Sequence, residues 1–273
     1  MNNTAKPGCA TQCGNITVPY PFGIGTNCSH SLSFNLTCNT SYEPPKLFLE
    51  NVIIYSITDL ELRIFTTFSY NCYDQNGLVD SYLSWNDFRG LNEFTFSEKN
   101  KFTVIGCDDY AWITGTEEDD FTSGCFGLCR KAPETTNGQC SGIGCCQISI
   151  RKGLSNYNIT LFTLKSHSGV LSFNRCGFGF LVEERMFKFE GVRDLSSNYL
   201  DFMERIESTM PVVLDWVIKP FENCTTEVNV CKGQSSCYDV DGGGYRCRCN
   251  QGYEGNPYLH PGCQGTSVSP VIN

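Results

Sequence analysis

Cysteine is the residue type with the widest chemical potential in this chain, since thiols bind metals, act as nucleophiles or pair into disulfides. The 273 residues contain 18 cysteines but only three histidines. Cys9 and Cys13, like Cys125 and Cys129, have the close spacing of thiolate metal ligands, so an intracellular metal protein is one interpretation. The even number and high density favour the other interpretation, in which the cysteines form disulfides in an oxidising compartment.

Asparagine sequons support an oxidising, extracellular setting. Asn-x-Ser/Thr triplets accept N-linked glycans in secreted proteins, and five of the seven lie within the first 41 residues. The residues after Met1 lack the apolar stretch of a signal peptide, so we expect that such a signal has been removed. The predicted glycosylation sites are Asn2, Asn15, Asn27, Asn35, Asn39, Asn158 and Asn223.

The charge balance and the motif content exclude several classes of function. Lys plus Arg number 20 and Asp plus Glu number 29, giving a net charge of −9, which argues against a broad basic face for nucleic acid. No run reaches the roughly 18 apolar residues that a membrane-spanning helix needs. The chain also lacks Gly-x-Ser-x-Gly, His-Glu-x-x-His and phosphate-binding glycine-loop motifs, so we predict that it is not an enzyme.

The elements that hold these residues are predicted to be mainly β-strands. Alternation of apolar or β-branched residues at period two predicts strands over 60–68, 94–96, 102–104 and 159–163. The aromatic-rich segment 178–189 is predicted to be a hairpin. Apolar residues at three- and four-residue steps predict one helix over 197–208, which Pro211 ends. We therefore expect a mainly β, disulfide-rich fold: a β-sandwich-like N-terminal region with about one short helix, followed by a small C-terminal module.

The last six cysteines form a compact pattern of their own. A single residue separates Cys247 from Cys249, and Gly252-Tyr253 follows, so the spacing resembles an epidermal-growth-factor-like (EGF-like) module. About 40 residues have too little core to fold alone, and three bridges supply the missing restraint. The resemblance implies the pairs Cys224–Cys237, Cys231–Cys247 and Cys249–Cys263.

Calcium is the cofactor that this resemblance raises. The calcium-binding subtype of the module places carboxylates before its first cysteine and an Asp or Asn between the third and fourth, because Ca²⁺ takes hard oxygen ligands. Glu222 and Asp239 stand at these positions. Only one carboxylate precedes the first cysteine, and the glycines at 242–244 lengthen the later loop. We therefore expect no cofactor, with calcium at Glu222 and Asp239 as the alternative.

The N-terminal region carries a second resemblance. The run Cys9-x3-Cys13-Gly-Asn-Ile16-x2-Pro19-Tyr-Pro-Phe-Gly23 resembles the galacturonan-binding module of plant wall-associated receptor kinases, as does the later run Asn100-Lys-Phe-x-Val-Ile-Gly-Cys107. The resemblance continues through Gly142-Ile-Gly-Cys-Cys-Gln147 to roughly residue 264, and departs at Arg151, where the family usually has proline. It implies a galacturonan-binding-like cysteine-rich module at 7–107, a second β-rich region at 108–221, an EGF-like module at 222–264 and a tail at 265–273.

This resemblance implies the outer part of a receptor. The family carries a transmembrane helix and a cytoplasmic Ser/Thr kinase beyond such modules, and neither occurs in these residues, so we expect a receptor ectodomain at the plasma membrane or a secreted form in the cell wall. The implied ligand is cell-wall pectin, chiefly homogalacturonan and oligogalacturonides, in wall-integrity or defence signalling. The alternatives are a protein-recognition ectodomain for a secreted peptide, effector or co-receptor without polysaccharide affinity, and a structural spacer.

Basic side chains are the expected contacts for a polyanion such as homogalacturonan, because Arg and Lys pair with carboxylates. The net charge of −9 opposes long-range attraction, so binding needs a local basic patch or bridging calcium. Lys99 and Lys101 are two residues apart and would share one face of a strand. The predicted patch, with solvated surface charges as the alternative, comprises Arg63, Arg89, Lys99 and Lys101. The aromatic candidates for stacking on sugars, with core packing as the alternative, are Tyr20, Trp85 and Trp112.

Overall fold

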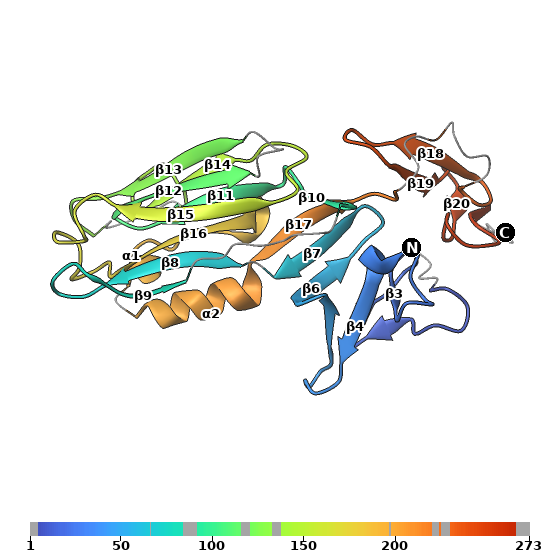
Figure 1. Ribbon diagram of the computed structural model, residues 1–273, viewed down its shortest axis with the longest axis horizontal. Helices are drawn as coiled ribbons and strands as arrows, with labels where there is room; N and C mark the ends of the chain where they lie inside the picture. The colour runs from blue at the N-terminus through green and yellow to red at the C-terminus, as the bar shows by residue number, and fades with distance from the viewer. Residues whose placement is uncertain are drawn as a thin grey trace, which may run out of the picture. The chain divides into compact units, whose positions relative to one another are not determined.

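Figure 1 shows a computed structural model of the chain. The structure describes residues 5–65, 67–83, 92–115, 121–132, 138–196, 198–219, 224 and 230–265. Contacts along the backbone divide the chain into two compact units. The terminal unit contains residues 1–63, 92–94 and 215–273, and the central unit contains residues 64–91 and 95–214.

This division cuts across the segments expected from the cysteine spacing. Both units take residues from the segment 7–107 and from the segment 108–221, because the chain enters the central unit at residue 64 and leaves it after residue 214. The passages between the units lie within β7 (Glu61–Phe65), β10 (Phe94–Phe96) and β17 (Pro211–Trp216). A division by contacts does not test module boundaries, which stay a prediction.

The N-terminal part of the terminal unit is built from short strands. These strands follow the order β7-β6-β5-β4-β3 within a seven-stranded sheet, in which β3 and β4 are parallel and β4, β5 and β6 are antiparallel. A two-stranded sheet, β1 with β2, precedes it, and a 3₁₀ turn over Leu32–Phe34 leads into β4. The bounds are β1 Gln12–Cys13, β2 Ile16–Thr17, β3 Gly23–Ile24, β4 Asn35–Asn39, β5 Lys46–Leu49 and β6 Val52–Ile57.

Aromatic rings fill the core of the terminal unit. Phe22, Phe34 and Trp216 are fully buried, and each pair meets edge to face with ring centroids 5.1–5.7 Å apart. Phe94 joins this cluster at 5.6 Å from Phe34. Edge-to-face packing of this kind adds about 0.5–1.5 kcal/mol per pair beyond the burial of apolar area. The family-like Pro-Tyr-Pro-Phe run therefore contributes Phe22 to a core that Trp216 completes.

Disulfides hold the C-terminal part of the terminal unit. The hairpin of β18 (Ser235–Asp239) and β19 (Tyr245–Cys249) is followed by the small sheet of β20 (Tyr253–Glu254) and β21 (Gln264–Gly265). The bridges are Cys224–Cys237, Cys231–Cys247 and Cys249–Cys263, the pairs that an EGF-like module implies. Asn256 ties this part to the N-terminal part, since its Nδ2 donates to the Tyr20 carbonyl at 2.6 Å.

The described part of the central unit contains two antiparallel sheets and two α-helices (Figure 1). The larger sheet has the order β14-β11-β16-β8-β9, and the smaller has the order β13-β12-β15. The helical elements are η2 Glu184–Met186, α1 Val192–Leu195 and α2 Tyr199–Thr209. The strand bounds are β8 Phe68–Tyr73, β9 Val79–Leu83, β11 Asn100–Ile105, β12 Asp108–Gly115, β13 Thr122–Leu128, β14 Cys145–Ser149, β15 Tyr157–Thr163 and β16 Cys176–Glu183.

The central strand β16 explains why the unit has three layers. Its alternating sequence Gly-Phe-Gly-Phe sends the rings of Phe178 and Phe180 to one face, where both contact Phe202 of α2. The other face carries glycines, and a side chain at Gly179 would come within 2.9 Å of Ile159 in β15. Because successive strand residues point to opposite faces, the rings support the helix while the glycines let the smaller sheet approach closely.

The predicted mainly β, disulfide-rich fold is confirmed, and the helix predicted over 197–208 is confirmed as α2. The predicted hairpin over 178–189 is wrong. This segment is one buried strand, β16, followed by the 3₁₀ turn η2, because its aromatic residues pack against α2 rather than against a second strand of their own. The remaining bridges are Cys9–Cys28, Cys13–Cys38, Cys72–Cys176, Cys107–Cys129, Cys125–Cys146 and Cys140–Cys145.

Candidate functional site

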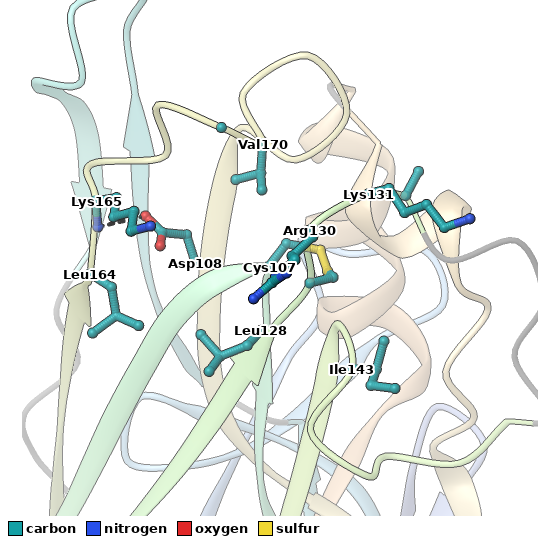
Figure 2. Close-up of a pocket in the computed structure, with 12 residues that line it drawn as sticks. Cys107, Asp108, Leu128, Arg130, Lys131, Ile143, Leu164, Lys165 and Val170 are labelled. Atoms are coloured by element: carbon teal, nitrogen blue, oxygen red, sulfur yellow. Dashed lines mark hydrogen bonds between the residues drawn. A yellow bond between two sulfur atoms is a disulfide. The ribbon is translucent and has the colours of Figure 1, made fainter.

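A pocket of about 890 Å³ lies in the central unit where the three strands of the smaller sheet reach one end (Figure 2). Three cationic side chains, Arg130, Lys131 and Lys165, line it together with exposed apolar side chains. We call it the basic pocket. Its volume lies within the range of ordinary ligand sites. In a chain with a net charge of −9, a pocket with three cations is a local reversal of sign.

Strand ends and one disulfide position the walls of the basic pocket. Leu128 is the last residue of β13, and Leu164 follows the last residue of β15. The bridge Cys107–Cys129 joins the residue before β12 to the residue after β13, so Arg130 leaves the sheet at a covalently fixed point. Figure 2 shows Leu128, Leu164 and Ile143 around the pocket, all of them at least 40% exposed.

Asp108 fixes the loop that carries Lys165. Its Oδ2 accepts hydrogen bonds from Thr163 Oγ1 at 2.7 Å, from the Lys165 amide at 2.8 Å and from the His167 amide at 2.9 Å. Ser166 and His167 have φ values of 50° and 57°, a left-handed conformation that side chains rarely adopt. Such strain persists only where surrounding contacts hold it, so Asp108 acts as the anchor of this wall.

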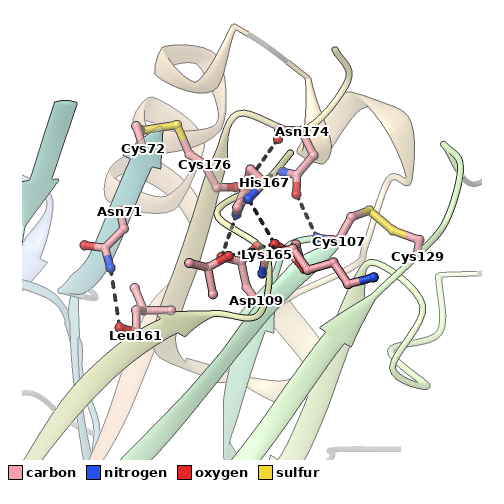
Figure 3. Close-up of polar contacts among 12 residues, drawn as sticks. Asn71, Cys72, Cys107, Asp109, Cys129, Leu161, Lys165, His167, Asn174 and Cys176 are labelled. Atoms are coloured by element: carbon pink, nitrogen blue, oxygen red, sulfur yellow. Dashed lines mark hydrogen bonds and ion pairs between the residues drawn. A yellow bond between two sulfur atoms is a disulfide. The ribbon is translucent and has the colours of Figure 1, made fainter. Parts of the chain in front are cut away.

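A buried His–Asp pair lies beneath the same loop (Figure 3). His167 Nε2 is 2.9 Å from Asp109 Oδ1, and its Nδ1 is 2.9 Å from the Asn174 carbonyl. A carbonyl only accepts, so Nδ1 carries a hydrogen, and the contact between Nε2 and the carboxylate needs one further proton. Asn174 also accepts from the Cys107 amide at 2.7 Å, which connects the pair to the bridge Cys107–Cys129.

Both partners of this pair hold a proton more tightly than usual. Burial raises the pKa of Asp109 above its ordinary value of 3.8. Burial, the largest single influence, would lower the pKa of His167, but the hydrogen bond to Asp109, the charges of Asp109 and Asp108 and the bond to the Asn174 carbonyl together raise that pKa above 6.5. Tyr73 stacks on the imidazole with ring centroids 4.2 Å apart, and burial raises the pKa of its hydroxyl to about 12.

The buried pair supports the pocket rather than carrying out chemistry. His167 and Asp109 are at most 1% exposed, so no substrate reaches them. The described residues contain no cluster of three or more His, Cys, Asp or Glu side chains that could hold a metal ion. The arrangement suits reversible binding of a negatively charged group, because three cations line the pocket. The carboxylate of Asp108 also lines it, but its Oδ2 already accepts three hydrogen bonds from the protein.

The predicted basic patch falls on different parts of the structure. Arg63 lies on β7, and its Nη2 pairs with Glu61 Oε2 at 3.0 Å. Lys101 lies on β11, where its Nζ donates to Ser149 Oγ at 2.9 Å and is 3.7 Å from Glu184 Oε2. Lys99 precedes β11, and Arg89 lies outside the described residues. The three described members do not line the basic pocket, so a single patch made by these four residues stays a prediction.

The other predicted sites are placed only in part. Asp239 Oδ1 accepts from the Cys224 amide at 2.5 Å, while Glu222 lies outside the described residues, so calcium binding there stays a prediction. Of the predicted glycosylation sites, Asn15, Asn27 and Asn158 are exposed, and Asn35 and Asn39 are partly buried. Asn2 and Asn223 lie outside the described part of the chain.

The terminal unit holds a smaller pocket of about 330 Å³ between its N-terminal and EGF-like parts. Aromatic residues Tyr20, Trp216 and Tyr258 line it, with Asp59 and Arg248 as charged groups. The predicted stacking residue Tyr20 is thus a wall of this pocket, while Trp112 is exposed in the central unit and Trp85 lies outside the described residues.

Comparison with known proteins places the chain. The family described as wall-associated receptor kinase galacturonan-binding matches residues 9–69. Wall-associated receptor kinase 2 of Arabidopsis thaliana is 41% identical over 94% of the chain, and wall-associated receptor kinase 5 of the same plant is 36% identical over 95%. Over nearly its whole length, the chain is similar to one part of the wall-associated receptor kinases. It spans about a third of the length of these relatives, 34% in each case. No solved structure matches it.

The matched region of these wall-associated kinases is the part without catalytic motifs. The 273 residues contain no kinase glycine-rich loop, His-Arg-Asp or Asp-Phe-Gly sequence, and they match about a third of the length of these kinases. No helix among the described residues is long and apolar enough to cross a membrane. Nine disulfides and the wall-associated relatives are consistent with an extracellular setting.

Sequence reasoning missed the basic pocket. Its cations come from two segments that the sequence separates by more than 30 residues, Arg130 with Lys131 and then Lys165. The available signal was the Arg130-Lys131 pair directly after Cys129, since consecutive cations beside a bridged cysteine are held at a fixed point of the surface.

Proposed function

We propose that this chain is the ligand-binding ectodomain of a wall-associated receptor and binds cell-wall homogalacturonan and its oligogalacturonide fragments. The observation that carries the proposal is the match of residues 9–69 to the family's galacturonan-binding domain, within a similarity that extends over nearly the whole chain. The exposed sequons and the bridged cysteines support a site of action in the cell wall. In the parent receptor, binding would regulate a Ser/Thr kinase for wall-integrity or defence signalling.

The charge of this ligand determines how a binder that is acidic overall can hold it. Homogalacturonan carries one carboxylate per sugar, and methyl esterification removes that charge. A protein with a net charge of −9 repels the polyanion at long range, so affinity must come from close contacts with Lys and Arg or from bridging calcium. Recognition should therefore depend on the free carboxylates and disappear when they are esterified.

The test is a binding titration of the oxidised, glycosylated chain with galacturonate oligomers of increasing length. The matched control ligand is the fully methyl-esterified oligomer of the same length, and each titration is run with calcium and with a chelator. Saturable binding of the acid form alone supports the proposal. Absence of binding to every oligomer, with a protein ligand captured instead, would replace it by the protein-recognition function.

A further inference from the structure

The outer face of the smaller sheet in the central unit carries an exposed aromatic row. Tyr110 of β12 lies opposite Phe126 of β13 and Phe162 of β15. The three rings stack across the strands with centroids 5.4 Å and 5.1 Å apart and planes within 16° of parallel. Phe126 and Phe162 remain 45% and 40% exposed. A contiguous exposed apolar patch is a candidate interaction surface.

Trp112 extends this face by one row. It is the next same-face residue of β12 after Tyr110, and it lies between Gly124 and Thr160 on the neighbouring strands. A side chain at Gly124 would come within 2.6 Å of the indole ring, so the ring lies over that glycine and is 39% exposed. A ring laid on a sheet in this way presents a flat apolar surface outward. We call Tyr110, Trp112, Phe126 and Phe162 the aromatic face.

The aromatic face leads directly into the basic pocket. Two residues beyond Phe126 and Phe162 come Leu128 and Leu164, which line the pocket (Figure 2). Alternate strand residues share a face, so the apolar side chains of the two outer strands continue on the face of Trp112 to the pocket, where Asp108 of β12 lies opposite Leu128. Six residues from the level of Trp112 to that of Arg130 give a strip about 20 Å long.

Resting on the proposed function, we infer that this strip, which lies outside the matched residues 9–69, is a site that holds the uronate oligosaccharide, with sugar rings on the aromatic face and carboxylates in the basic pocket. A galacturonate chain combines apolar C–H faces with a carboxylate on every ring. The strip offers the complementary sequence of surfaces, with planar aromatic groups first and Arg130, Lys131 and Lys165 at its end. The guanidinium of Arg130 can pair with a carboxylate through two parallel hydrogen bonds.

The same observations favour a slender sugar chain over an acidic protein. The exposed sequon residue Asn158 lies opposite Thr114, on the same face and one row beyond Trp112. A glycan there would stand beside the end of the strip that is remote from the basic pocket. It would obstruct a broad protein partner that covers the whole sheet, whereas a sugar chain one residue wide needs only the strip itself.

The test compares two double variants of equal charge change. Arg130→Ala with Lys165→Ala removes two cations from the basic pocket, and the control Arg185→Ala with Arg193→Ala removes two exposed cations of the central unit outside it. The probe is a galacturonate oligomer of roughly ten units, long enough to cover the strip. We expect at least about a tenfold loss of affinity for the pocket variant and less than about a twofold change for the control.

Further arms separate the possible failures. Trp112→Ala should weaken binding about threefold to tenfold, and this loss should be independent of salt because stacking is not ionic. Wild-type binding that the pocket variant and Trp112→Ala leave intact would overturn the site but not the proposed function. No wild-type binding at all would overturn both. Equal competition by poly-glutamate of the same charge would show that the strip recognises an acidic peptide, not a sugar. Unchanged circular dichroism and thermal transitions confirm that each variant is folded.

Discussion

Gly177 on β16 is predicted to tolerate no side chain. A methyl group at this position would lie 2.1 Å from Asp109 Oδ1 and 2.4 Å from its Cγ. The carboxylate cannot move to the other side, because the backbone at Gly106 already lies against it there. A methyl group added at Gly106 would be only 1.9 Å from Oδ2. Gly177→Ala must therefore displace Asp109 from His167, to which Oδ1 is bonded at 2.9 Å.

The magnitude follows from two contributions. Overpacking of a filled interior costs about 1–3 kcal/mol, and separating a buried charged pair costs about 3–5 kcal/mol. The two are not independent, since the same movement relieves the clash and breaks the pair. We therefore predict that Gly177→Ala lowers the free energy of unfolding of the central unit by about 3–5 kcal/mol.

Two neighbouring glycines provide graded controls. At Gly179, an added methyl group would meet a side-chain methyl of Ile159 at 2.9 Å, which can shift, so Gly179→Ala should cost about 1–2 kcal/mol. At Gly169, nothing lies within 4 Å and the backbone is not in the left-handed region, so Gly169→Ala should change stability by less than about 1 kcal/mol.

The assay is urea denaturation with the disulfides intact, combined with hydrogen exchange of peptides from residues 95–214 to assign the change to the central unit. The order of destabilisation should be Gly177→Ala, then Gly179→Ala, then Gly169→Ala. The reasoning is refuted if Gly177→Ala is no more destabilising than Gly169→Ala, because the carboxylate would then have room that the structure denies it.

Three further predictions concern the pH response, a disulfide and the EGF-like part. The pKa of His167 is raised in the folded protein, so the stabilisation from its pairing with Asp109 is complete below the ordinary pKa of 6.5 and is lost as pH rises through the folded pKa. The free energy of unfolding, measured between about pH 5.5 and 8, should fall accordingly, and His167→Gln should abolish this pH dependence. Removing the bridge Cys72–Cys176, which spans 104 residues, should cost about 4–5 kcal/mol in the same assay. Asn256→Ala removes the bond to the Tyr20 carbonyl and should speed amide exchange over residues 253–259 without unfolding the central unit.

Local patterns in the sequence were sufficient where short-range physics decides the structure. The three- and four-residue spacing of Leu200, Met203 and Ile206 predicted α2, although the helix buries Phe202 and Ile206 and leaves Leu200 exposed. The spacing of the last six cysteines implied their pairing for a similar reason, since a small module offers little core besides its bridges.

Patterns failed where the partner of a residue is distant in sequence. The rings of β16 suggested a hairpin, but their partner is Phe202 of α2, and only the assembled layers reveal it. The basic pocket was missed because Arg130 and Lys165 meet only after β12 pairs with both β13 and β15. No periodicity encodes which strands become neighbours, so a site built from three strand ends is not readable from spacing alone.

The opposition between the acidic chain and the basic pocket gives binding a distinctive salt dependence. The net charge of −9 acts on an approaching polyanion over the whole molecule, whereas Arg130 and Lys165 act at contact. The screening length is about 30 Å at 0.01 M salt, 10 Å at 0.1 M and 3 Å at 1 M. Adding salt up to roughly 0.1 M therefore removes the repulsion first, and higher salt then weakens the contacts.

The affinity for a galacturonate oligomer should accordingly pass through a maximum near roughly 0.1 M salt. Titrations at fixed pH across the range 0.01–1 M check this, with Arg130→Ala plus Lys165→Ala as the comparison. A monotonic fall from the lowest salt would mean that the overall charge does not oppose binding, as for a protein with a broad basic face. A monotonic rise would mean that the cations contribute nothing and that apolar stacking alone holds the sugar. If the affinity passes through a maximum in the unaltered chain and not in the double variant, then both the acidic surroundings and the cationic pocket determine binding.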